Sequence, residues 1–267
     1  MNPKKAESQK EWPWPEYLVA WHFFRQISNE DEETAVHLLA HNHWPERGGL
    51  SAFDVGSGDG RIIEGLVHGR RVKEHHLREV RFLDPNAKLV AKAKAALRGK
   101  IHSVESIHGH LRDRGIWPDK AVDVDVVLAI HVVYLMEELE LILLLAQRPK
   151  KAVLFVILDA PTSIFTQLWA ETAPLYHNRS IAAHRVLTQE KYGLKMTSTI
   201  LAKFPRAEID KHPNGEWLLS MLCYRDMRSR NVSPRLLNRV HSILDKHTDS
   251  TGTYVECQSN CYAFPPN

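Results

Sequence analysis

A glycine-rich segment holds the residues of this sequence that are best suited to bind a ligand. It reads Asp54-Val-Gly56-Ser-Gly58-Asp-Gly60 and lies where an apolar stretch meets a helical pattern. Glycines at such a junction let the backbone turn sharply and approach a ligand without Cβ clashes. The spacing is G-x-G-x-G rather than the G-x-G-x-x-G of dinucleotide sites. Asp54 places a carboxylate beside the ligand, which disfavours a pyrophosphate and suits a cation or hydroxyl groups.

A second acidic residue, Asp84, ends the next apolar stretch and is followed by Pro85. In a Rossmann-like sheet this position faces the ribose hydroxyls of an adenosine ligand. An ordinary turn would explain the glycines alone, but it would not explain the glycines together with both carboxylates. The combination predicts a ligand that contains a nucleoside.

Strand and helix patterns alternate around these residues, and these elements must position them. Strands are predicted at 50–55, 79–83, 104–107, 122–130 and 152–158, and helices within 16–40 and at 61–67, 86–97 and 137–147. Such alternation predicts an α/β fold with a parallel sheet and helices on both faces. The unbroken apolar character of the last two strands indicates burial on both sides. Further helices are predicted at 164–175, 188–192, 215–224 and 234–247, and further strands at 196–204 and 252–264.

The glycine loop with its preceding Asp, together with Asp84, resembles the first two motifs of the class I S-adenosylmethionine-dependent methyltransferases. The resemblance implies a Rossmann-like seven-stranded sheet, with five parallel strands and a closing antiparallel pair, and S-adenosylmethionine as cofactor. It also implies which residues contact that cofactor. Those for its amino-acid part are Asp54, Gly56, Gly58 and Gly60; those for its ribose, adenine and sulfonium regions are Asp84, Pro85, His110 and Ile130.

Within that family the sequence is most similar to histamine N-methyltransferase. The similar stretches are 16–30, Ile130-His131-Val-Val-Tyr134, 164–169, Asn214-Gly215-Glu216 and the terminal strand. Carried over by position, the implied acceptor pocket contains Tyr17, Trp21, Glu30, His131, Tyr134, Phe165, Trp169, Tyr176, Met221 and Gln258. His131, Phe165 and Gln258 depart from that enzyme, which has Gln, Trp and Asn at these places.

An aromatic pocket with one acidic residue suits an organic cation or a heteroaromatic amine. His131 and Glu30 are the predicted catalytic residues that orient the acceptor and accept its proton, and Gln258 reaches the ligand from the last strand. The prediction is therefore N-methylation of a small amine or imidazole compound. Two alternatives stay open: O- or C-methylation of an aromatic natural product with His131 as base, and a cofactor-binding partner protein without turnover. The aromatic residues and His131 also suit an ordinary core.

Composition excludes several other classes. The net charge is +3, from 35 Lys and Arg against 32 Asp and Glu, which is too small to indicate a nucleic-acid partner. No apolar run approaches the length of a membrane span, the N-terminus lacks a signal-peptide pattern, and three cysteines make no disulfide framework. We expect a cytoplasmic protein, a monomer in preference to an oligomer, with a small molecule as its partner.

No metal is expected. The histidine pairs do not match zinc patterns. Asp159 ends the fifth strand, where catechol-type methyltransferases place a metal-binding carboxylate, but its companion residues are not evident in the sequence. We expect two parts in the chain: a tail and helical substrate-binding lid at 1–45, and a methyltransferase domain at 46–267. That domain contains a predicted substrate-binding insertion at about 161–190.

Overall fold

The computed structural model describes residues 14–68, 77–121, 123–194, 196–228 and 232–266. Most of the predicted N-terminal tail lies outside these ranges. The strands are β1 (Leu50–Val55), β2 (Leu77–Asp84), β3 (Ser103–His108), β4 (Val126–Ile130), β5 (Val153–Asp159), β6 (Met196–Pro205) and β7 (Tyr254–Phe264). The α-helices are α1 (Trp14–Ile27), α2 (Glu30–Ala40), α3 (Arg61–His68), α4 (Ala87–Leu97), α5 (Glu138–Ala146), α6 (Ile164–Thr172), α7 (Pro174–Leu187), α8 (Asn214–Cys223) and α9 (Pro234–Lys246).

The strands form one seven-stranded sheet in the order β3-β2-β1-β4-β5-β7-β6. The pairs β1–β2, β2–β3, β1–β4 and β4–β5 are parallel. β7 runs antiparallel to both of its neighbours, β5 and β6, so β6 points the same way as the first five strands. The predicted Rossmann-like sheet and its closing antiparallel pair are confirmed. The strand order reverses between β1 and β4, and open α/β sheets bind ligands at such a switch point.

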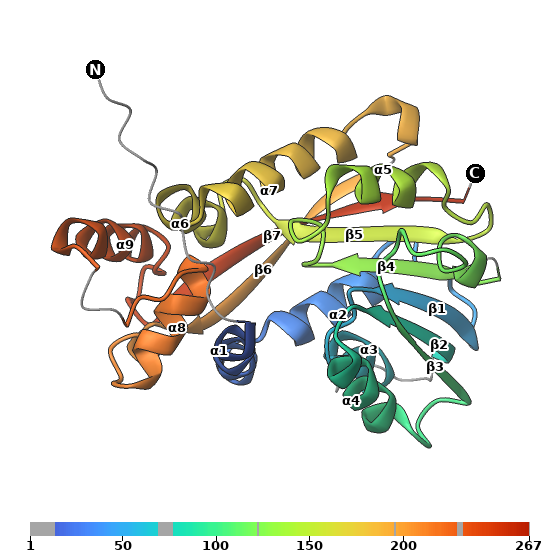
Figure 1. The fold of residues 1–267 in the computed structure, drawn as a ribbon, viewed down its shortest axis with the longest axis horizontal. Helices are drawn as coiled ribbons and strands as arrows, with labels where there is room; N and C mark the ends of the chain where they lie inside the picture. The colour runs from blue at the N-terminus through green and yellow to red at the C-terminus, as the bar shows by residue number, and fades with distance from the viewer. Residues whose placement is uncertain (1–13, 69–76, 122, 195, 229–231, 267) are drawn as a thin grey trace.

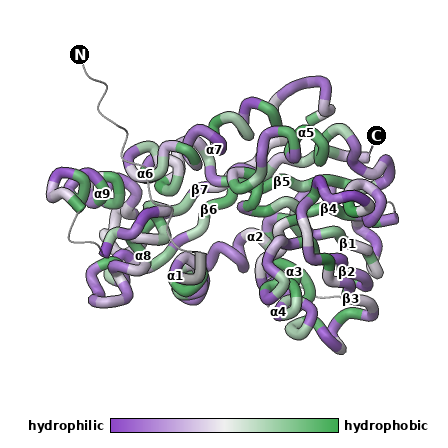
Figure 2. Tube along the Cα trace, viewed as in Figure 1, coloured by the Kyte–Doolittle hydropathy of each residue, from purple (hydrophilic) through white to green (hydrophobic). Residues whose placement is uncertain are grey.

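The central strands are apolar because helices cover both of their faces. Every residue of β4 and β5 is buried, as their continuous hydrophobicity predicts (Figure 2). β4 begins at Val126, later than predicted. Asp123 and Asp125 interrupt the apolar run before it, and the carboxylate of Asp125 accepts the backbone N–H of Ser51 at 2.9 Å. Residue 122, the predicted start of this strand, lies outside the described ranges.

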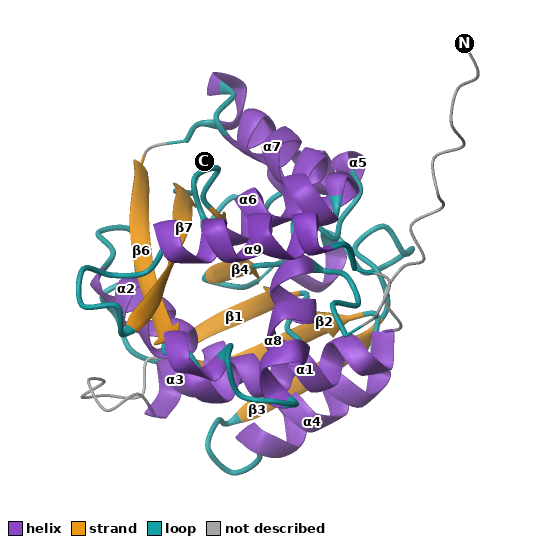
Figure 3. Cartoon of the chain, turned by 90° about the vertical axis from the view of Figure 1, so that its left-hand side faces the viewer, coloured by secondary structure: helices purple, strands orange, loops and turns teal. Residues whose placement is uncertain are grey.

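Figure 1 shows α5 and α7 on one side of the sheet and α2, α3 and α4 on the other. Each set contributes to its own core cluster, the first with Leu144 and Leu187 and the second with Leu38 and Leu66. A third cluster joins α1, α6, α8 and α9 to the ends of β6 and β7. These four helices lie together in front of the strands in Figure 3. The N-terminal and C-terminal helices thus enclose one end of the sheet.

Helix α7 corrects the secondary structure predicted within 161–190. The pattern indicated one helix at 164–175, whereas the chain breaks at Ala173 and a new helix starts at Pro174. The short helix predicted at 188–192 is present as a 3-10 helix at Glu190–Tyr192. Proline favours a first helical position because it has no N–H to leave unpaired. The helix is hard to recognise because its composition is polar and its buried side includes Ser180 and His184.

Two further features bear on the predicted class of protein. None of the helices in the described ranges is both long and apolar enough to span a membrane. The three cysteines, Cys223, Cys257 and Cys261, are buried and form no disulfide.

Candidate active site

A large cavity opens at the carboxyl ends of the parallel strands. Its volume is about 1210 Å³ with its mouth included. A concave cavity at this edge of an open α/β sheet is the usual place for a small-molecule ligand. Seven of the eight residues predicted to contact the cofactor line it: Asp54, Gly56, Gly58, Asp84, Pro85, His110 and Ile130.

The glycine loop forms one wall of this cavity in a conformation that side chains would obstruct. Gly56 has φ +68°, and a Cβ on it would lie 2.2 Å from Cγ2 of Val132. Gly58 has φ +54°, and a Cβ there would lie 3.0 Å from the indole of Trp21 in α1. Both positions therefore require glycine, which lets the backbone itself approach a ligand.

Gly60 plays a different part from the one predicted. It does not line the cavity. Its φ is +80°, and a Cβ on it would lie 2.8 Å from Cβ of Ala93 in α4. The missing side chain lets the start of α3 pack closely against α4, so this glycine serves helix packing.

Two carboxylates lie beside the loop. Asp84 Oδ2 accepts the N–H of Gly58 at 3.1 Å, and Oδ1 accepts the N–H of Asn86 at 2.7 Å. Burial raises the pKa of Asp84, which these two hydrogen bonds oppose. Burial, reinforced by the charge of Asp84, raises the pKa of Asp54 to about 8. Two buried carboxyl groups at one wall suit a cationic group and hydroxyl donors, as the sequence indicates.

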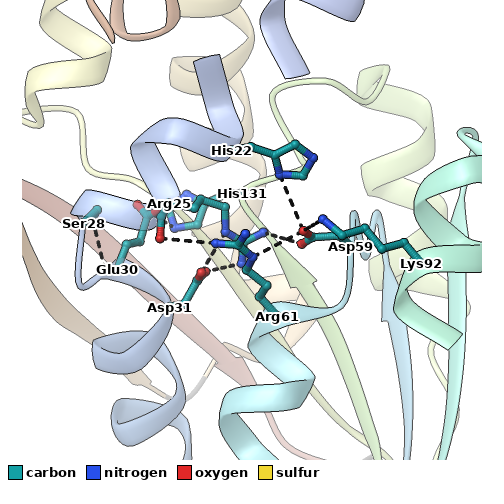
Figure 4. A network of polar contacts seen from close by, with 9 residues as sticks. All are labelled: His22, Arg25, Ser28, Glu30, Asp31, Asp59, Arg61, Lys92 and His131. Carbon is teal, nitrogen blue, oxygen red and sulfur yellow. Dashed lines mark hydrogen bonds and ion pairs between the residues drawn. The ribbon is translucent and has the colours of Figure 1, made fainter. Parts of the chain in front are cut away.

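A buried ion-pair network ties this loop to helix α1 (Figure 4). The Asp59 side chain is 1% exposed. Its oxygens lie 3.2 Å from Nη1 of Arg25, 2.9 Å from Nζ of Lys92, 3.3 Å from Nε of Arg61 and 3.6 Å from Nδ1 of His22. Burial alone would raise the pKa of Asp59, but Arg25, Lys92 and Arg61 lower it.

A second, inner cavity of about 360 Å³ adjoins the first. Apart from the three predicted catalytic residues, six of the seven members of the implied acceptor pocket line it: Tyr17, Trp21, Tyr134, Phe165, Trp169 and Met221. Tyr176 lies behind this wall, where its ring centroid is 6.5 Å from that of Trp169 and 4.0 Å from that of Tyr224. The remaining lining residues are Phe24, Glu30, His131 and Asp159.

Glu30, His131 and Asp159 form a polar cluster in this aromatic pocket. Oε1 of Glu30 is 3.6 Å from Nε2 of His131, and Oδ2 of Asp159 is 3.8 Å from Nδ1 of the same ring. His131 follows β4 with φ +52°, a conformation that non-glycine residues rarely adopt and that is concentrated at functional sites. Its N–H donates to the carbonyl of Ile157 in β5 at 2.7 Å, which fixes the turn.

The environment of the cluster sets its protonation. Burial raises the pKa of Glu30 to about 7. Burial also raises the pKa of Asp159 to about 7, and the charge of Glu30 adds to the rise while His131 opposes it. Burial lowers the pKa of His131, against the attraction of Asp159. At neutral pH the imidazole is therefore uncharged, and each carboxyl group is close to its midpoint.

No family model and no curated protein matches the sequence. Solved structures do match. An S-adenosylmethionine-dependent methyltransferase of Geobacter sulfurreducens, in complex with S-adenosylhomocysteine, has a TM-score of 0.52 and 14% identity over 94% of this chain and 98% of its own. A candidate methyltransferase of Bacillus halodurans has a TM-score of 0.53 and 12% identity over 88% and 96%. The fold is that of the class I S-adenosylmethionine-dependent methyltransferases. At these identities the likeness shows the fold alone.

In this methyltransferase fold the inner pocket has polar atoms without partners. Nε2 of His131, Oδ1 of Asp159 and Nε1 of Trp169 are buried and accept or donate no hydrogen bond among the described residues. Buried polar groups in proteins are nearly always hydrogen-bonded, so unpaired ones require an explanation. A polar ligand in the pocket would supply the missing partners.

One predicted catalytic residue lies apart from the others. Gln258 lines neither cavity. Its Oε1 accepts a hydrogen bond from Oγ1 of Thr162 at 3.3 Å, and its backbone carbonyl accepts the N–H of Ala160 at 2.9 Å. It therefore supports the turn after β5 at the edge of the pocket.

The sequence did not associate Asp159 with His131 and Glu30. The three residues offer ligand atoms that all lie within 4.8 Å of one another, a set that could hold a metal ion. One sequence signal could have indicated this association. His131 follows β4 and Asp159 ends β5, and these two strands are parallel neighbours in the sheet. The expectation of no metal is thus a prediction to be tested on this cluster.

Proposed function

We propose that this protein is an S-adenosylmethionine-dependent N-methyltransferase of a small amine or imidazole compound. The observation that carries the proposal is the position of Glu30 and His131. Both line the large cavity beside the glycine loop and also the aromatic inner pocket. A methyl donor in the first cavity and an acceptor in the second would meet at these two side chains.

The residues of the first cavity fit the proposed cofactor. Gly56 and Gly58 leave the backbone bare where a Cβ would collide with Val132 or Trp21. The carboxylate of Asp84 suits ribose hydroxyls, and the buried Asp54 suits the positive charge of an α-amino group. When bound, S-adenosylmethionine supplies a methyl group on a positively charged sulfur.

The chain contributes mainly by positioning the acceptor and removing its proton. Holding two reactants in line is worth roughly 7–11 kcal/mol of the barrier. Nitrogen attacks through a lone pair, so the acceptor atom must be unprotonated. The neutral imidazole of His131 has an unpaired Nε2 that can accept this proton, and Glu30, 3.6 Å away, can orient the acceptor or take the charge.

The walls of the inner pocket favour a nitrogenous ligand. Tyr134 and Trp169 present rings whose centroids lie 4.9 Å apart, and Phe165 lies 6.0 Å from Trp169. Aromatic faces attract cations, and a wall of this kind also excludes water that would compete for the methyl group. The resemblance noted in the sequence between these positions and histamine N-methyltransferase is the reason for proposing an amine or imidazole as acceptor.

O- or C-methylation is the second candidate function. The same unpaired Nε2 of His131 would serve as the base that removes a proton from a phenol or a carbon acid. In that case His131→Ala should abolish turnover while Glu30→Gln has a small effect. For an amine acceptor, Glu30→Gln should reduce turnover strongly as well.

The test is a turnover assay with defined acceptors. Purified protein is incubated with S-adenosylmethionine and histamine, histidine dipeptides, indole-ethylamines, polyamines or simple phenols, and mass spectrometry measures methylated product and S-adenosylhomocysteine. Methylation of an amine or imidazole is the expected result. Methylation of phenols alone would replace it with the second candidate, and cofactor binding without turnover of any acceptor would indicate a partner protein.

A further inference from the structure

Asp159 is held in place by contacts to its backbone and by Ser163 at its side chain. Its carbonyl accepts Nε2–H of His184 in α7 at 2.8 Å, and Nδ1 of that ring accepts the hydroxyl of Tyr262 in β7 at 2.5 Å. Asp159 also ends β5 opposite Ser259 in the ladder with β7. A rigid frame of three elements therefore presents its side chain to the inner pocket.

The carboxylate itself is buried and incompletely satisfied. The side chain is 3% exposed, and Oδ1 has no hydrogen-bond partner among the described residues. The imidazole of His131, 3.8 Å from Oδ2, is neutral near pH 7 and too distant for a hydrogen bond. A buried carboxylate oxygen without a partner is costly, so a frame that preserves one indicates that a ligand supplies the partner.

Asp159 lies deeper than the other two members of the cluster. Glu30 and His131 line both cavities, whereas Asp159 lines the inner cavity alone, as Phe165 and Trp169 do. Glu30 and His131, the side chains that would contact the reacting nitrogen, thus lie where the two cavities meet. Asp159 and Trp169, whose Nε1–H is unpaired, line the inner cavity alone, so an acceptor would meet them at its far end, remote from the methyl donor.

The charges near the pocket favour a cation at that far end. Glu30 and Asp159 are both acidic. Arg25 also lines the large cavity, but its guanidinium already contacts the carboxylates of Asp31 and Asp59. The aromatic rings around Asp159 strengthen the attraction for an organic cation and provide no competing ammonium or guanidinium.

We propose that the inner pocket contains a second recognition site, in which Asp159 binds a cationic group at the far end of the acceptor. The acceptor is then a molecule with two nitrogen centres, one methylated at Glu30 and His131 and one held as an ammonium at Asp159. This inference rests on the proposed function, because it assigns the two ends of the acceptor relative to the methyl donor. Asp159 acts here as a specificity residue.

The test compares two ligands of equal length that differ by one ammonium group. Calorimetry measures the binding of 1,4-diaminobutane and of pentylamine to protein saturated with S-adenosylhomocysteine. Wild-type protein should bind the diamine at least about tenfold more tightly, since a buried charged hydrogen bond is worth that much or more. In the Asp159→Asn variant the diamine and the monoamine should bind with similar affinities. Asp119 is exposed, and its substitution Asp119→Asn should leave both affinities unchanged.

The outcomes separate this inference from the proposed function. Failure of wild-type protein to bind S-adenosylhomocysteine would contradict the proposed function. Normal binding of S-adenosylhomocysteine, with a diamine preference that is absent or survives Asp159→Asn, would overturn the second site alone. Binding of Mn²⁺ that Asp159→Asn abolishes and that diamine does not displace would also overturn it, because the cluster would then be a metal site. Retained S-adenosylhomocysteine binding in Asp159→Asn shows that the variant is folded.

Discussion

Nη1 of Arg25 in helix α1 lies 3.2 Å from Oδ1 of Asp59 in the glycine-rich loop. The same guanidinium donates through Nε to Asp31 of α2 at 2.8 Å and lies 4.5 Å from the ring centre of Trp21. The loop that would hold the cofactor is thereby connected to the helices that line the acceptor pocket. Changes on one side of this contact are expected to affect ligand binding on the other.

Asp59→Asn should destabilise the protein and weaken cofactor binding. The variant keeps the shape of the side chain but removes the anion that the buried Arg25 shares with the more exposed Lys92 and Arg61. Breaking one partner of a buried ion pair costs about 3–5 kcal/mol. Denaturant unfolding should show a loss of that order, and calorimetry should show weaker binding of S-adenosylhomocysteine. Unchanged values in both experiments would contradict the role of this network.

Gly56→Ala should abolish cofactor binding, and Gly99→Ala is its matched control. Both glycines have a similar positive φ, +68° and +78°, so both substitutions incur a backbone strain of about 1–2 kcal/mol. Only at Gly56 does the new Cβ collide, 2.2 Å from Cγ2 of Val132, whereas at Gly99 it meets open space. Calorimetry with S-adenosylhomocysteine should therefore distinguish the two variants. Equal affinities would show that the close approach at Gly56 is unimportant.

The pH dependence of turnover should reveal Glu30. Because burial raises the pKa of this carboxyl to about 7, its charged form appears as the pH rises through that value. The kcat/KM of the wild-type protein should rise between about pH 6 and pH 8 for a given acceptor. Glu30→Gln should remove this step, and Glu32→Gln, an exposed change on the same helix, should keep it. An identical pH profile for both variants would exclude Glu30 from the chemistry.

Asp159→Asn should stabilise the unliganded protein above pH 7. The pKa of this carboxyl is raised in the folded state from 3.8 to about 7, so the folded state binds more protons than the unfolded state in that interval. In the wild-type protein, the contribution of the Asp159 carboxyl to the free energy of unfolding is therefore fully present below about pH 4. It is lost as the pH rises to about 7. Asparagine does not titrate, so its advantage should grow over the same range to the order of 4 kcal/mol.

Thermal unfolding at pH 5 and pH 8 checks the sign of this effect. The melting temperature of Asp159→Asn should exceed that of wild type by several degrees at pH 8 and by less at pH 5. A variant less stable than wild type at pH 8 would mean that the carboxylate already has a stabilising partner in the unliganded protein.

Local signals in the sequence accounted for the cofactor side of the site. Gly56 and Gly58 have a positive φ that favours glycine, so the loop can be predicted from its glycines. Asp84 directly follows the apolar residues of β2, so the end of this strand can also be predicted from a short segment. The resemblance to histamine N-methyltransferase predicted that Tyr17 and Trp169 share one pocket, although they come from α1 and α6.

The features that were missed depend on contacts between distant segments. Asp159 meets His131 because β4 pairs with β5, and its carbonyl is held by His184 of the unpredicted helix α7. Gln258 was placed correctly on a strand, but its side chain contacts Thr162 at the edge of the pocket rather than its interior. Strand pairing and side-chain direction at the end of a sheet are tertiary properties that periodicity does not encode.

Binding of S-adenosylhomocysteine to the purified protein is the most direct test of the proposed cofactor site. Titration calorimetry should show one molecule bound per chain, with an affinity that Asp84→Ala weakens at least about tenfold through loss of a charged hydrogen-bond acceptor. The exposed Asp119→Asn should bind as wild type does. Absence of binding by the folded wild-type protein, or equal binding by Asp84→Ala, would contradict the assignment of the large cavity to this cofactor.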